Sequence, residues 1–341
     1  ARGKCVPLLK TLLTSYCTNE CAYCAFRSGR KGPRMVWEPE KLAEITLHLW
    51  RERKIRGLFL SSAVQGDPDH VTEKQLEVLR HLRARGYTGY IHLRIMPGTN
   101  RYRIREAAEL ADRLGVNLEA PNREIFDEIC PDKGGFEEAV LRRLDWTVDE
   151  VQRAKREANR PNFGFGKAGV DTQMIVGAAQ DNDWEYLQTT ERLYKKSNLR
   201  RVYYSGFEPI FDTPLEKRAA CPLSREYRLY QSSFLLRDYG FKADDLAQVM
   251  DEQGFLPNLD PKQALAEANP DLFPMDLNDA TYYEMLRIPR IGPVTARRII
   301  EARRQTKIRY TSDLERILGA RFTRRIRRYV ELKDKLLSDF P

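Results

Sequence analysis

The chain has 341 residues, 42% hydrophobic and 31% charged, and no stretch approaches the roughly 20 uninterrupted apolar residues that cross a bilayer. The first residues lack an apolar run followed by a small-residue cleavage site, and the six cysteines do not follow the spacing of a disulfide framework. These features exclude membrane-spanning and disulfide-rich secreted proteins, and they predict a cytoplasmic protein in a reducing compartment.

Positive charge is concentrated at one end of the chain. Residues 287–341 carry 16 Lys and Arg against 6 Asp and Glu, a net of +10, whereas the rest of the chain carries 42 against 43, a net of −1. A charge needed only for solubility has no reason to collect at one end. The distribution therefore favours a polyanionic partner for the last 55 residues over a solvated basic helix face.

Strand-like segments alternate with amphipathic helical segments along the first two thirds of the chain. The predicted strands are residues 6–15, 57–62, 89–96, 115–120, 169–177 and 200–207. The predicted helices are residues 38–54, 71–86, 103–115, 147–160 and 181–197, with 224–240 after the last strand. Such a repeat predicts an α/β fold in which helices cover a parallel sheet, here a partial or full TIM-like (β/α)6 barrel.

Polar residues recur on one face of these predicted strands. Residues 89–96 place Ile91 on one face and His92 and Arg94 on the other, and Asn117 and Glu119 share a face in the next strand. Buried polar side chains are unfavourable unless they contact a ligand, water or one another. The pattern predicts a barrel lumen that holds a ligand.

A change of composition marks the predicted domain boundary. Residues 255–279 are rich in proline and asparagine, which is typical of a linker. We therefore expect a barrel domain over residues 1–254, a linker over 255–279 and a small basic all-α domain over 280–341.

Three of the six cysteines, Cys17, Cys21 and Cys24, lie within eight residues, directly after the first predicted strand. A structural zinc ion would require four protein ligands, and the nearest histidine is His48, on the far side of a predicted helix segment. A [4Fe–4S] cluster held by three cysteines instead leaves one iron open to a substrate or cofactor. The spacing favours the cluster over a zinc site or unrelated cysteines.

The segment from Cys17 to Cys24, with an aromatic residue just before its last cysteine and a (β/α) repeat behind it, resembles the radical S-adenosylmethionine (SAM) superfamily. The resemblance implies that SAM chelates the open iron through its amino and carboxylate groups. It also implies an electron donor, whose electron cleaves SAM to methionine and a hydrogen-abstracting 5′-deoxyadenosyl radical. Cys17, Cys21 and Cys24 are then the metal ligands and the catalytic centre.

The resemblance also implies a set of SAM contacts, each of which has an ordinary structural alternative. The Gly-Gly-Glu motif of the superfamily is absent, and Ser61 and Ser62 stand in its place, where a simple turn would also explain them. The other implied contacts are Tyr23 near the adenine, Asn117 and Glu119 at the ribose or carboxylate, and the segment from Met174 to Gly177 against the adenine. Internal hydrogen bonding or core packing are the alternatives for the last two groups.

The three isolated cysteines are Cys5, Cys130 and Cys221. A radical enzyme can use a thiol to return a hydrogen atom to its product, but a buried cysteine more often behaves as a small apolar side chain. The sequence does not decide between these roles.

A helix, a tight turn and a second helix are predicted over residues 286–304. The backbone N–H groups at the start of the second helix, with the positive end of its dipole behind them, suit a phosphate. This segment resembles the helix-hairpin-helix motif of sequence-independent DNA binders, although Arg290 replaces the first glycine of the usual Pro-Gly-Ile-Gly turn. Residues 310–330 resemble a degenerate second hairpin around Gly319. The implied nucleic-acid contacts are Arg290, Gly292, Val294, Thr295, Arg297 and Arg298, and a protein-docking hairpin is the alternative.

Several segments, in order along essentially the whole chain, together resemble the DNA modification or repair family of radical SAM proteins. That resemblance implies DNA as the partner, presented as a single strand or a flipped nucleotide because a base inside a duplex cannot reach a barrel lumen. An RNA-modifying radical SAM enzyme, a binding protein with a structural cluster, and a metabolic enzyme with an incidental basic tail remain the alternatives. The target base, the reductant and any partner protein do not follow from the sequence.

Overall fold

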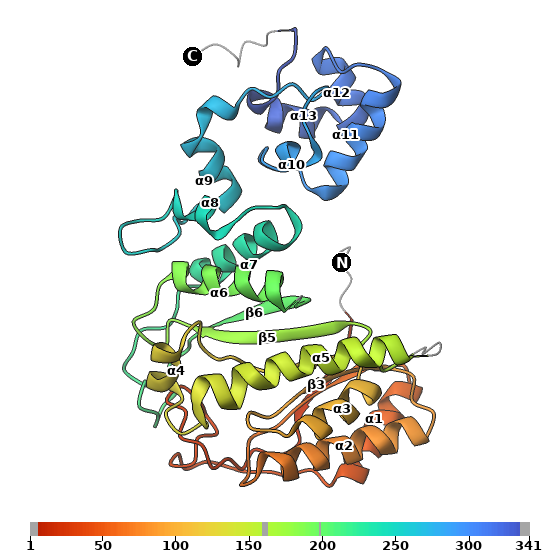
Figure 1. The fold of residues 1–341 in the computed structure, drawn as a ribbon, viewed down its shortest axis with the longest axis vertical. Helices are drawn as coiled ribbons and strands as arrows, with labels where there is room; N and C mark the ends of the chain where they lie inside the picture. Colours follow the sequence, from red (N-terminus) through yellow and green to blue (C-terminus); the bar gives the residue numbers. More distant parts are fainter. Residues whose placement is uncertain (1–5, 159–162, 198, 335–341) are drawn as a thin grey trace. The chain divides into compact units, whose positions relative to one another are not determined.

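Figure 1 shows the computed structural model, which describes residues 6–158, 163–197 and 199–334. The chain divides into two compact units. The first comprises Ala1–Asp181 with Arg192–Glu226, and the second comprises Asn182–Glu191 with Tyr227–Pro341. Each unit is considered separately below.

The first unit contains one sheet of six parallel strands. The strands are β1 (Leu8–Leu12), β2 (Gly57–Ser61), β3 (Tyr90–Arg94), β4 (Arg113–Gly115), β5 (Gly169–Val176) and β6 (Arg201–Gly206). Their order in the sheet is their order in the chain, and within the described residues β1 and β6 do not pair with each other. The sheet is therefore an open half-barrel, which confirms the partial barrel and not the full one.

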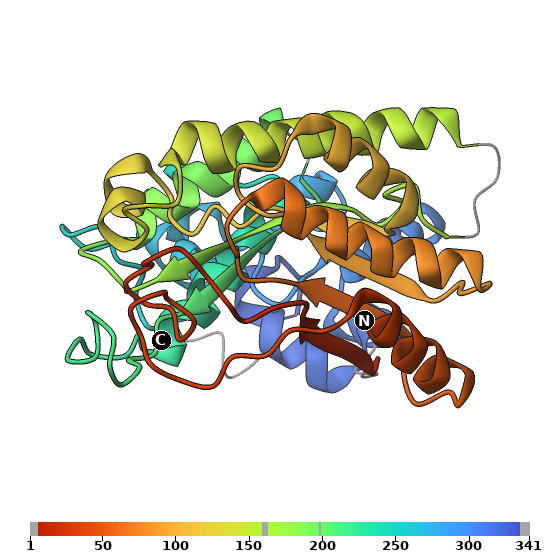
Figure 2. The same cartoon turned by 90° about the horizontal axis from the view of Figure 1, so that it is seen from below.

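Helices cover one face of this sheet, as Figures 1 and 2 show for α1 (Pro39–Arg51), α2 (Pro68–Ala84), α3 (Arg101–Leu110) and α5 (Arg142–Glu157). The strand residues that point toward them, such as Leu58, Leu60 and Leu93, are completely buried. Burial of each such side chain contributes about 1.5–3 kcal/mol. The opposite face of the sheet, called the inner face below, is the one left for a ligand.

The fourth strand begins earlier than the sequence predicted. We expected a helix over 103–115 and a strand over 115–120, but α3 ends at Leu110 and β4 already begins at Arg113. The carboxylate of Asp112 accepts hydrogen bonds from the backbone N–H of Ile91, at 2.8 Å, and from Arg83. These contacts attach the chain to β3 directly after the helix, a long-range effect that the local pattern does not contain.

Additional helical segments follow β4. They are α4 (Arg123–Ile129) and a π-helical segment (Gly135–Leu141) that continues directly into α5, so this helical stretch begins before the expected residue 147. The last two residues of the helix expected over 147–160 lie outside the described residues. Helix α6 (Asp183–Lys196) follows β5.

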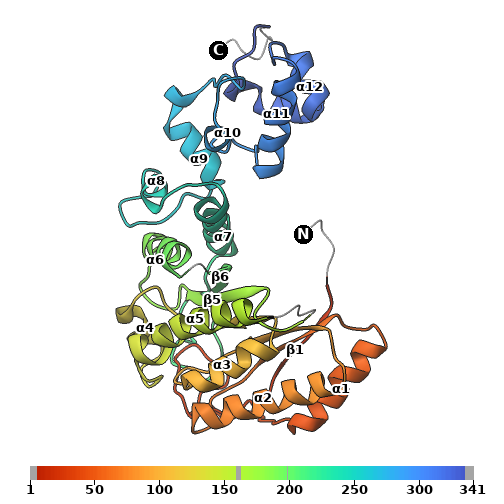
Figure 3. The ribbon, with the colours of Figure 1, turned by 45° about the vertical axis from the view of Figure 1, so that its right-hand side comes forward.

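The second unit carries helices, and no strand lies among its described residues. After α7 (Leu223–Asp238), most of which belongs to this unit, come α8 (Ala243–Ala247), α9 (Pro261–Ala268), α10 (Tyr282–Met285), α11 (Pro293–Gln305), α12 (Thr311–Leu318) and α13 (Ala320–Ile326) (Figure 3). Their apolar core includes Met285, Ile291, Ile299, Leu314 and Ile326.

The expected linker over residues 255–279 is structured. It contains α9, and its Ala266 and Leu277 are buried in the core of the second unit. Proline suggested a break here, but Pro261 occupies the first turn of α9, where its missing N–H is no loss, and Asp260 caps the helix. Across the described residues, no helix combines the length and the apolarity needed to cross a membrane.

Candidate functional site

The three clustered cysteines lie on a loop that follows β1 and is fixed at several points. The backbone N–H of Thr18 donates to Val64 O at 2.8 Å, and the Thr18 hydroxyl donates to the same oxygen. The N–H of Ala22 donates to Ile129 O at the end of α4, and the N–H of Glu20 donates to the carboxylate of Asp132. The loop is thus attached to segments that follow both β2 and β4.

All three cysteines line one cavity of about 260 Å³ on the inner face of the half-barrel. Because side chains alternate across a strand, residues from several strands reach it together. The predicted site residues that line it are Cys17, Cys21, Cys24, Tyr23, Ser61, Ser62, Asn117 and Glu119. Ile175, from the predicted segment Met174 to Gly177, lines it as well, and so do residues that the sequence analysis did not single out, among them Phe26, Lys133 and Gln173.

The structure does not bring Met174 or Gly177 into this cavity. Met174 is completely buried, and its strand neighbours Gln173 and Ile175 line the cavity instead. The physical reason is the alternation of β5, which directs adjacent side chains to opposite faces. Gly177, with φ +85°, lies beside Cys221, where an added Cβ would be 3.0 Å from the Cβ of that cysteine. The apolar contact implied for this segment therefore falls to Ile175.

Glu119 and Lys133 form a buried ion pair in the cavity wall. The ammonium of Lys133 donates to Glu119 Oε1 at 2.6 Å, and the two side chains are 10% and 5% exposed. Burial opposes the charge of Lys133, but Glu119, followed by Cys21 and Cys130, raises the pKa of Lys133 well above its ordinary value. Lys133 therefore stays charged next to the thiols. No local motif in the sequence points to it.

The backbone of Glu119 is in the left-handed region, at φ +65°, which is uncommon for a residue other than glycine. Its N–H donates to Gln173 O at 3.0 Å, and its carbonyl accepts from Ile175 N at 2.7 Å. These bonds hold the strained residue against β5. Strain of this kind is typical of functional positions.

The thiols of the loop have different environments. A hydrogen bond from Cys130 lowers the pKa of Cys21 to about 7, and Lys133 adds to this effect while burial opposes it. Burial raises the pKa of Cys24. Cys130 itself is almost completely buried and does not line the cavity, whereas the three loop cysteines do. Among the described residues, no three metal-ligating side chains are already gathered around one point.

Two polar groups in the cavity differ in their hydrogen bonding: one has no partner within the described residues and the other already has one. Asn117 Oδ1 is buried and has no hydrogen-bond partner within the described residues, which is unfavourable unless a ligand donates to it. The Ser62 hydroxyl accepts a hydrogen bond from the backbone N–H of Thr14, so it supports the loop after β1. One cavity is lined by three thiols, an amide oxygen without a partner in the described part of the chain, and a fixed ion pair. This set of groups fits a three-cysteine iron–sulfur cluster with a polar organic ligand beside it.

The other two isolated cysteines lie elsewhere. Cys221 is buried beside Gly177 and Gly206, away from the cavity, and Cys5 lies outside the described residues. Of the two isolated cysteines within the described residues, Cys130 is the one that contacts the loop of Cys17, Cys21 and Cys24, through its hydrogen bond with Cys21.

The second unit contains the predicted hairpin, between α10 and α11. Arg290 has φ +69°, so the turn keeps the left-handed conformation that glycine usually provides, with an exposed arginine in its place. Gly292 is the N-cap of α11, and an added Cβ there would lie 3.1 Å from the Tyr239 hydroxyl. The N–H groups of Val294 and Thr295, in the first turn of α11, have no acceptor within the helix.

The arginines that follow the turn divide into two groups. Arg297 and Arg298 are exposed on α11. Arg303 instead donates to the carbonyls of Leu277 and Ala280, both at 2.7 Å, and is a structural residue. A shorter second pair, α12 and α13, is joined by Gly319 at φ +87°. The structure therefore brings the predicted hairpin contacts together on the start of one helix.

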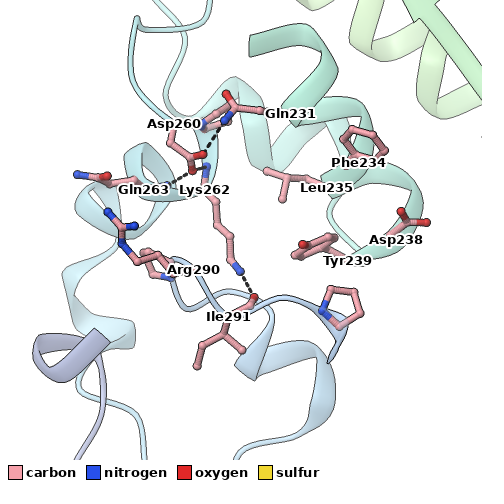
Figure 4. Close-up of a pocket in the computed structure, with 13 residues that line it drawn as sticks. Gln231, Phe234, Leu235, Asp238, Tyr239, Asp260, Lys262, Gln263, Arg290 and Ile291 are labelled. Atoms are coloured by element: carbon pink, nitrogen blue, oxygen red, sulfur yellow. Dashed lines mark hydrogen bonds between the residues drawn. The ribbon is translucent and has the colours of Figure 1, made fainter. Parts of the chain in front are cut away.

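A cavity of about 420 Å³ lies behind the hairpin turn, between α7, α9 and residues 289–293 (Figure 4). Lys262 crosses it, and its ammonium donates to Ile291 O and lies 5.0 Å from the centre of the Tyr239 ring. Burial lowers the pKa of Lys262 to about 7, and Asp260 opposes this shift. The lysine thus supports the turn at a position where its charge depends on pH.

We expect the second unit to become more stable as the pH rises from about 7 toward 10.5, the ordinary pKa of lysine. Between these pH values Lys262 is protonated in the unfolded chain and neutral in the folded chain, so the free energy of unfolding rises with pH. Below about pH 7 Lys262 is protonated in both states, and it no longer makes the stability depend on pH. Urea unfolding across this range should show the rise in wild type and a weaker one in Lys262→Met. An equal rise in both proteins would assign it to another group.

Comparison with known proteins finds a family match within the first unit and solved structures with a similar fold. Residues 11–153 match the Radical SAM superfamily. The chain resembles the solved structure of the FeFe-hydrogenase maturase HydG from Carboxydothermus hydrogenoformans, with a TM-score of 0.52 at 14% identity over 95% of this chain and 82% of that one. It also resembles methylornithine synthase (PylB), with a TM-score of 0.52 at 17% identity over 68% of this chain and 62% of that one.

A second HydG structure matches with a TM-score of 0.51 at 13% identity, over 68% of this chain and 50% of that one. The chain thus spans half of that HydG chain and 62% of the PylB chain. No curated protein sequence matches it significantly. These structural likenesses establish the half-barrel fold, and the family match shows that residues 11–153 form a domain of the Radical SAM superfamily, whose members use a [4Fe–4S] cluster and SAM.

Proposed function

We propose that this chain is a radical SAM enzyme that modifies or repairs DNA, with its chemistry in the first unit and nucleic-acid binding in the second. The observation that supports the chemistry is the single cavity lined by Cys17, Cys21 and Cys24 together with Asn117 and Glu119. When bound, the cluster and SAM would supply a 5′-deoxyadenosyl radical that abstracts hydrogen from the substrate.

Several side chains that line the cavity have a proposed role. The three thiolates would hold the cluster and leave one of its irons open to SAM. The unpaired Asn117 Oδ1 accepts a hydrogen bond from a hydroxyl of the ribose. Lys133 fixes the carboxylate of Glu119 in one orientation, so that its remaining acceptor capacity is directed at the ligand. Phe26 and Ile175 contribute apolar surface that keeps water from the reacting atoms.

DNA as the partner is supported by charge and by the hairpin. The excess of positive charge lies in residues 287–341, the first turn of α11 presents backbone N–H groups, and the exposed Arg297 and Arg298 follow in the next turn. Such contacts bind phosphate without reading sequence. The base to be modified would be presented in a single strand or flipped from a duplex, because a stacked base cannot enter the cavity of the first unit.

The test measures 5′-deoxyadenosine formed by anaerobically reconstituted, reduced protein with SAM, in the presence of single-stranded DNA, duplex DNA or RNA of matched sequence. We expect DNA to stimulate product formation more than RNA does. Preference for RNA would make the chain an RNA-modifying enzyme, a possibility that phosphate contacts alone leave open. Product formation that ignores nucleic acid and survives truncation near residue 279 would instead indicate a metabolic enzyme.

Arg297→Ala with Arg298→Ala is expected to weaken nucleic-acid binding about equally for all sequences. Loss of two phosphate contacts should reduce the slope of log K against log salt by about 1–2. Fluorescence anisotropy of a labelled oligonucleotide over a range of salt concentrations measures it. Lys41→Ala with Arg105→Ala, two exposed cations on α1 and α3, is the matched control. An unchanged slope in the α11 variant would exclude this docking surface.

A further inference from the structure

The inner face of the half-barrel extends beyond the cysteine cavity toward the beginnings of the strands. Strand pairing places Lys10 beside Phe59, Phe59 beside His92, and His92 beside Arg113. These residues are two positions before residues of the same strands that line the cavity, such as Leu12, Ser61 and Arg94, and therefore point to the same face. Asp171, Arg201 and Tyr203 continue the row across β5 and β6.

Cations and aromatic rings alternate along this row. Lys10 Nζ lies 5.4 Å from the centre of the Phe59 ring, and Arg201 Cζ lies 5.1 Å from the centre of the Tyr203 ring. Arg94 lies between the two rings, 5.7 Å from Phe59 and 5.9 Å from Tyr203. Lys10 is exposed, and Phe59, Tyr203 and Arg201 are partly exposed, so both kinds of group are accessible on the face of the sheet that also carries the cavity, whereas His92, Arg94 and Asp171 between them are buried.

Most of the charged side chains of this row are cations. Its described members include Lys10, Arg94, Arg113 and Arg201, together with the carboxylate of Asp171. Asp171 is already engaged by Arg94, by His92 Nε2 at 3.0 Å from Asp171 Oδ2, and by Arg113 Nε at 3.9 Å from the same oxygen. Burial lowers the pKa of His92, so this histidine adds no charge at neutral pH.

The pair of Arg94 and Asp171 is built into the fold. It passes over Gly115, where an added Cβ would lie 1.9 Å from Arg94 Nη1 and 2.3 Å from Asp171 Oδ1. Arg113 is also fixed, because its guanidinium donates to Ala168 O at 3.0 Å and to the Tyr203 hydroxyl at 3.4 Å. The row is therefore a preorganised set of cations and rings, which lowers the entropic penalty of binding.

Alternating cations and aromatic rings match one class of ligand. Bases pack on aromatic side chains and phosphates pair with lysine and arginine in proteins that bind single-stranded nucleic acid. We propose that Lys10, Phe59, Arg113, Arg201 and Tyr203 bind a segment of single-stranded nucleic acid that leads the target nucleotide into the cysteine cavity. This inference rests on the proposed function and names the form in which its substrate enters the first unit.

The first test is photo-cross-linking of the full chain to a single-stranded DNA of about 8 nucleotides that carries 5-bromouracil, a length within the usual site size. The protein carries Arg297→Ala and Arg298→Ala, so that the hairpin contributes less to binding of the oligonucleotide. We expect mass spectrometry to find cross-links in the peptides that contain Phe59 and Tyr203. Cross-links confined to residues 286–304 would overturn this inference and leave nucleic-acid binding by the hairpin intact. An absence of any binding would overturn both.

The second test measures affinity by anisotropy in the same background. Lys10→Glu with Arg201→Glu should weaken binding about tenfold at low salt, since it removes two cations and adds two anions beside the phosphates. The control is Lys41→Glu with Arg105→Glu, which makes the same change of charge on exposed positions of the outer helices. If the reversal prevents folding, Lys10→Gln with Arg201→Gln replaces it. Equal affinity of these variants and the control would refute the proposal.

Discussion

Cys21→Ala is expected to abolish 5′-deoxyadenosine formation from reduced protein and SAM. Cys21 is one of three thiols that face the cavity, and two remaining thiolates cannot hold a cluster that offers one open iron to SAM. The variant should also lose the iron and the visible absorption of the reconstituted protein, while its affinity for nucleic acid stays within about twofold of wild type because the hairpin is unaffected.

The matched control is Cys221→Ala. This cysteine is equally buried, but it lies beside Gly177 and Gly206 and does not line the cavity. We expect the control to retain both iron and product formation. Continued 5′-deoxyadenosine formation by Cys21→Ala would show that the ligands have been assigned to the wrong residues.

Lys133→Met is expected to destabilise the apoprotein by about 3–5 kcal/mol, because it leaves the carboxylate of Glu119 buried without its counter-ion. Both side chains are at least nine-tenths buried, and Glu119 already has a left-handed backbone. Urea unfolding followed by circular dichroism measures the change in the free energy of unfolding.

The double variant Lys133→Met with Glu119→Gln separates the loss of the pair from the loss of lysine packing. It removes the uncompensated charge, so we expect it to recover at least about 1 kcal/mol relative to Lys133→Met alone. If the single variant cost less than about 1 kcal/mol, the ion pair would have no structural importance in the folded protein.

Much of the half-barrel could be predicted from the sequence because its signals are local and repeated. Apolar alternation identified β1, β2, β3, β5 and β6, and Arg94, Asn117 and Glu119 line the cavity as the period of two residues predicted. The exception is the boundary between α3 and β4, which depends on contacts of Asp112 with β3 and α2. Such contacts link residues far apart in sequence and leave no local pattern.

The gathering of the three cysteines in one cavity was predictable for the same reason, since they lie within eight consecutive residues. Lys133 and Cys130 were not, because the helical segments after β4 bring them to the loop from more than a hundred residues away. Met174 was assigned to the cavity by resemblance of its segment, and strand alternation places it on the opposite face. In the second unit, proline suggested a linker where it begins a helix.

The nucleic-acid contacts remain a prediction that the geometry supports. Arg290 keeps the left-handed turn conformation at a position where glycine is usual, although a side chain there is unfavourable by about 1–2 kcal/mol. An exposed arginine next to the first turn of α11 offsets this strain if an anion binds there. A cationic side chain at this position of the turn is the feature that favours an anionic partner over a neutral protein surface in our proposal.

The most direct measurement is electron paramagnetic resonance of the anaerobically reconstituted and reduced protein, with and without SAM. If Cys17, Cys21 and Cys24 hold a [4Fe–4S] cluster with one open iron, the reduced protein should give the signal of such a cluster, and the shape of this signal should change when SAM is added. Metal analysis should find iron and sulfide and no stoichiometric zinc. A protein that binds zinc, or an iron centre whose spectrum is the same with and without SAM, would contradict the account.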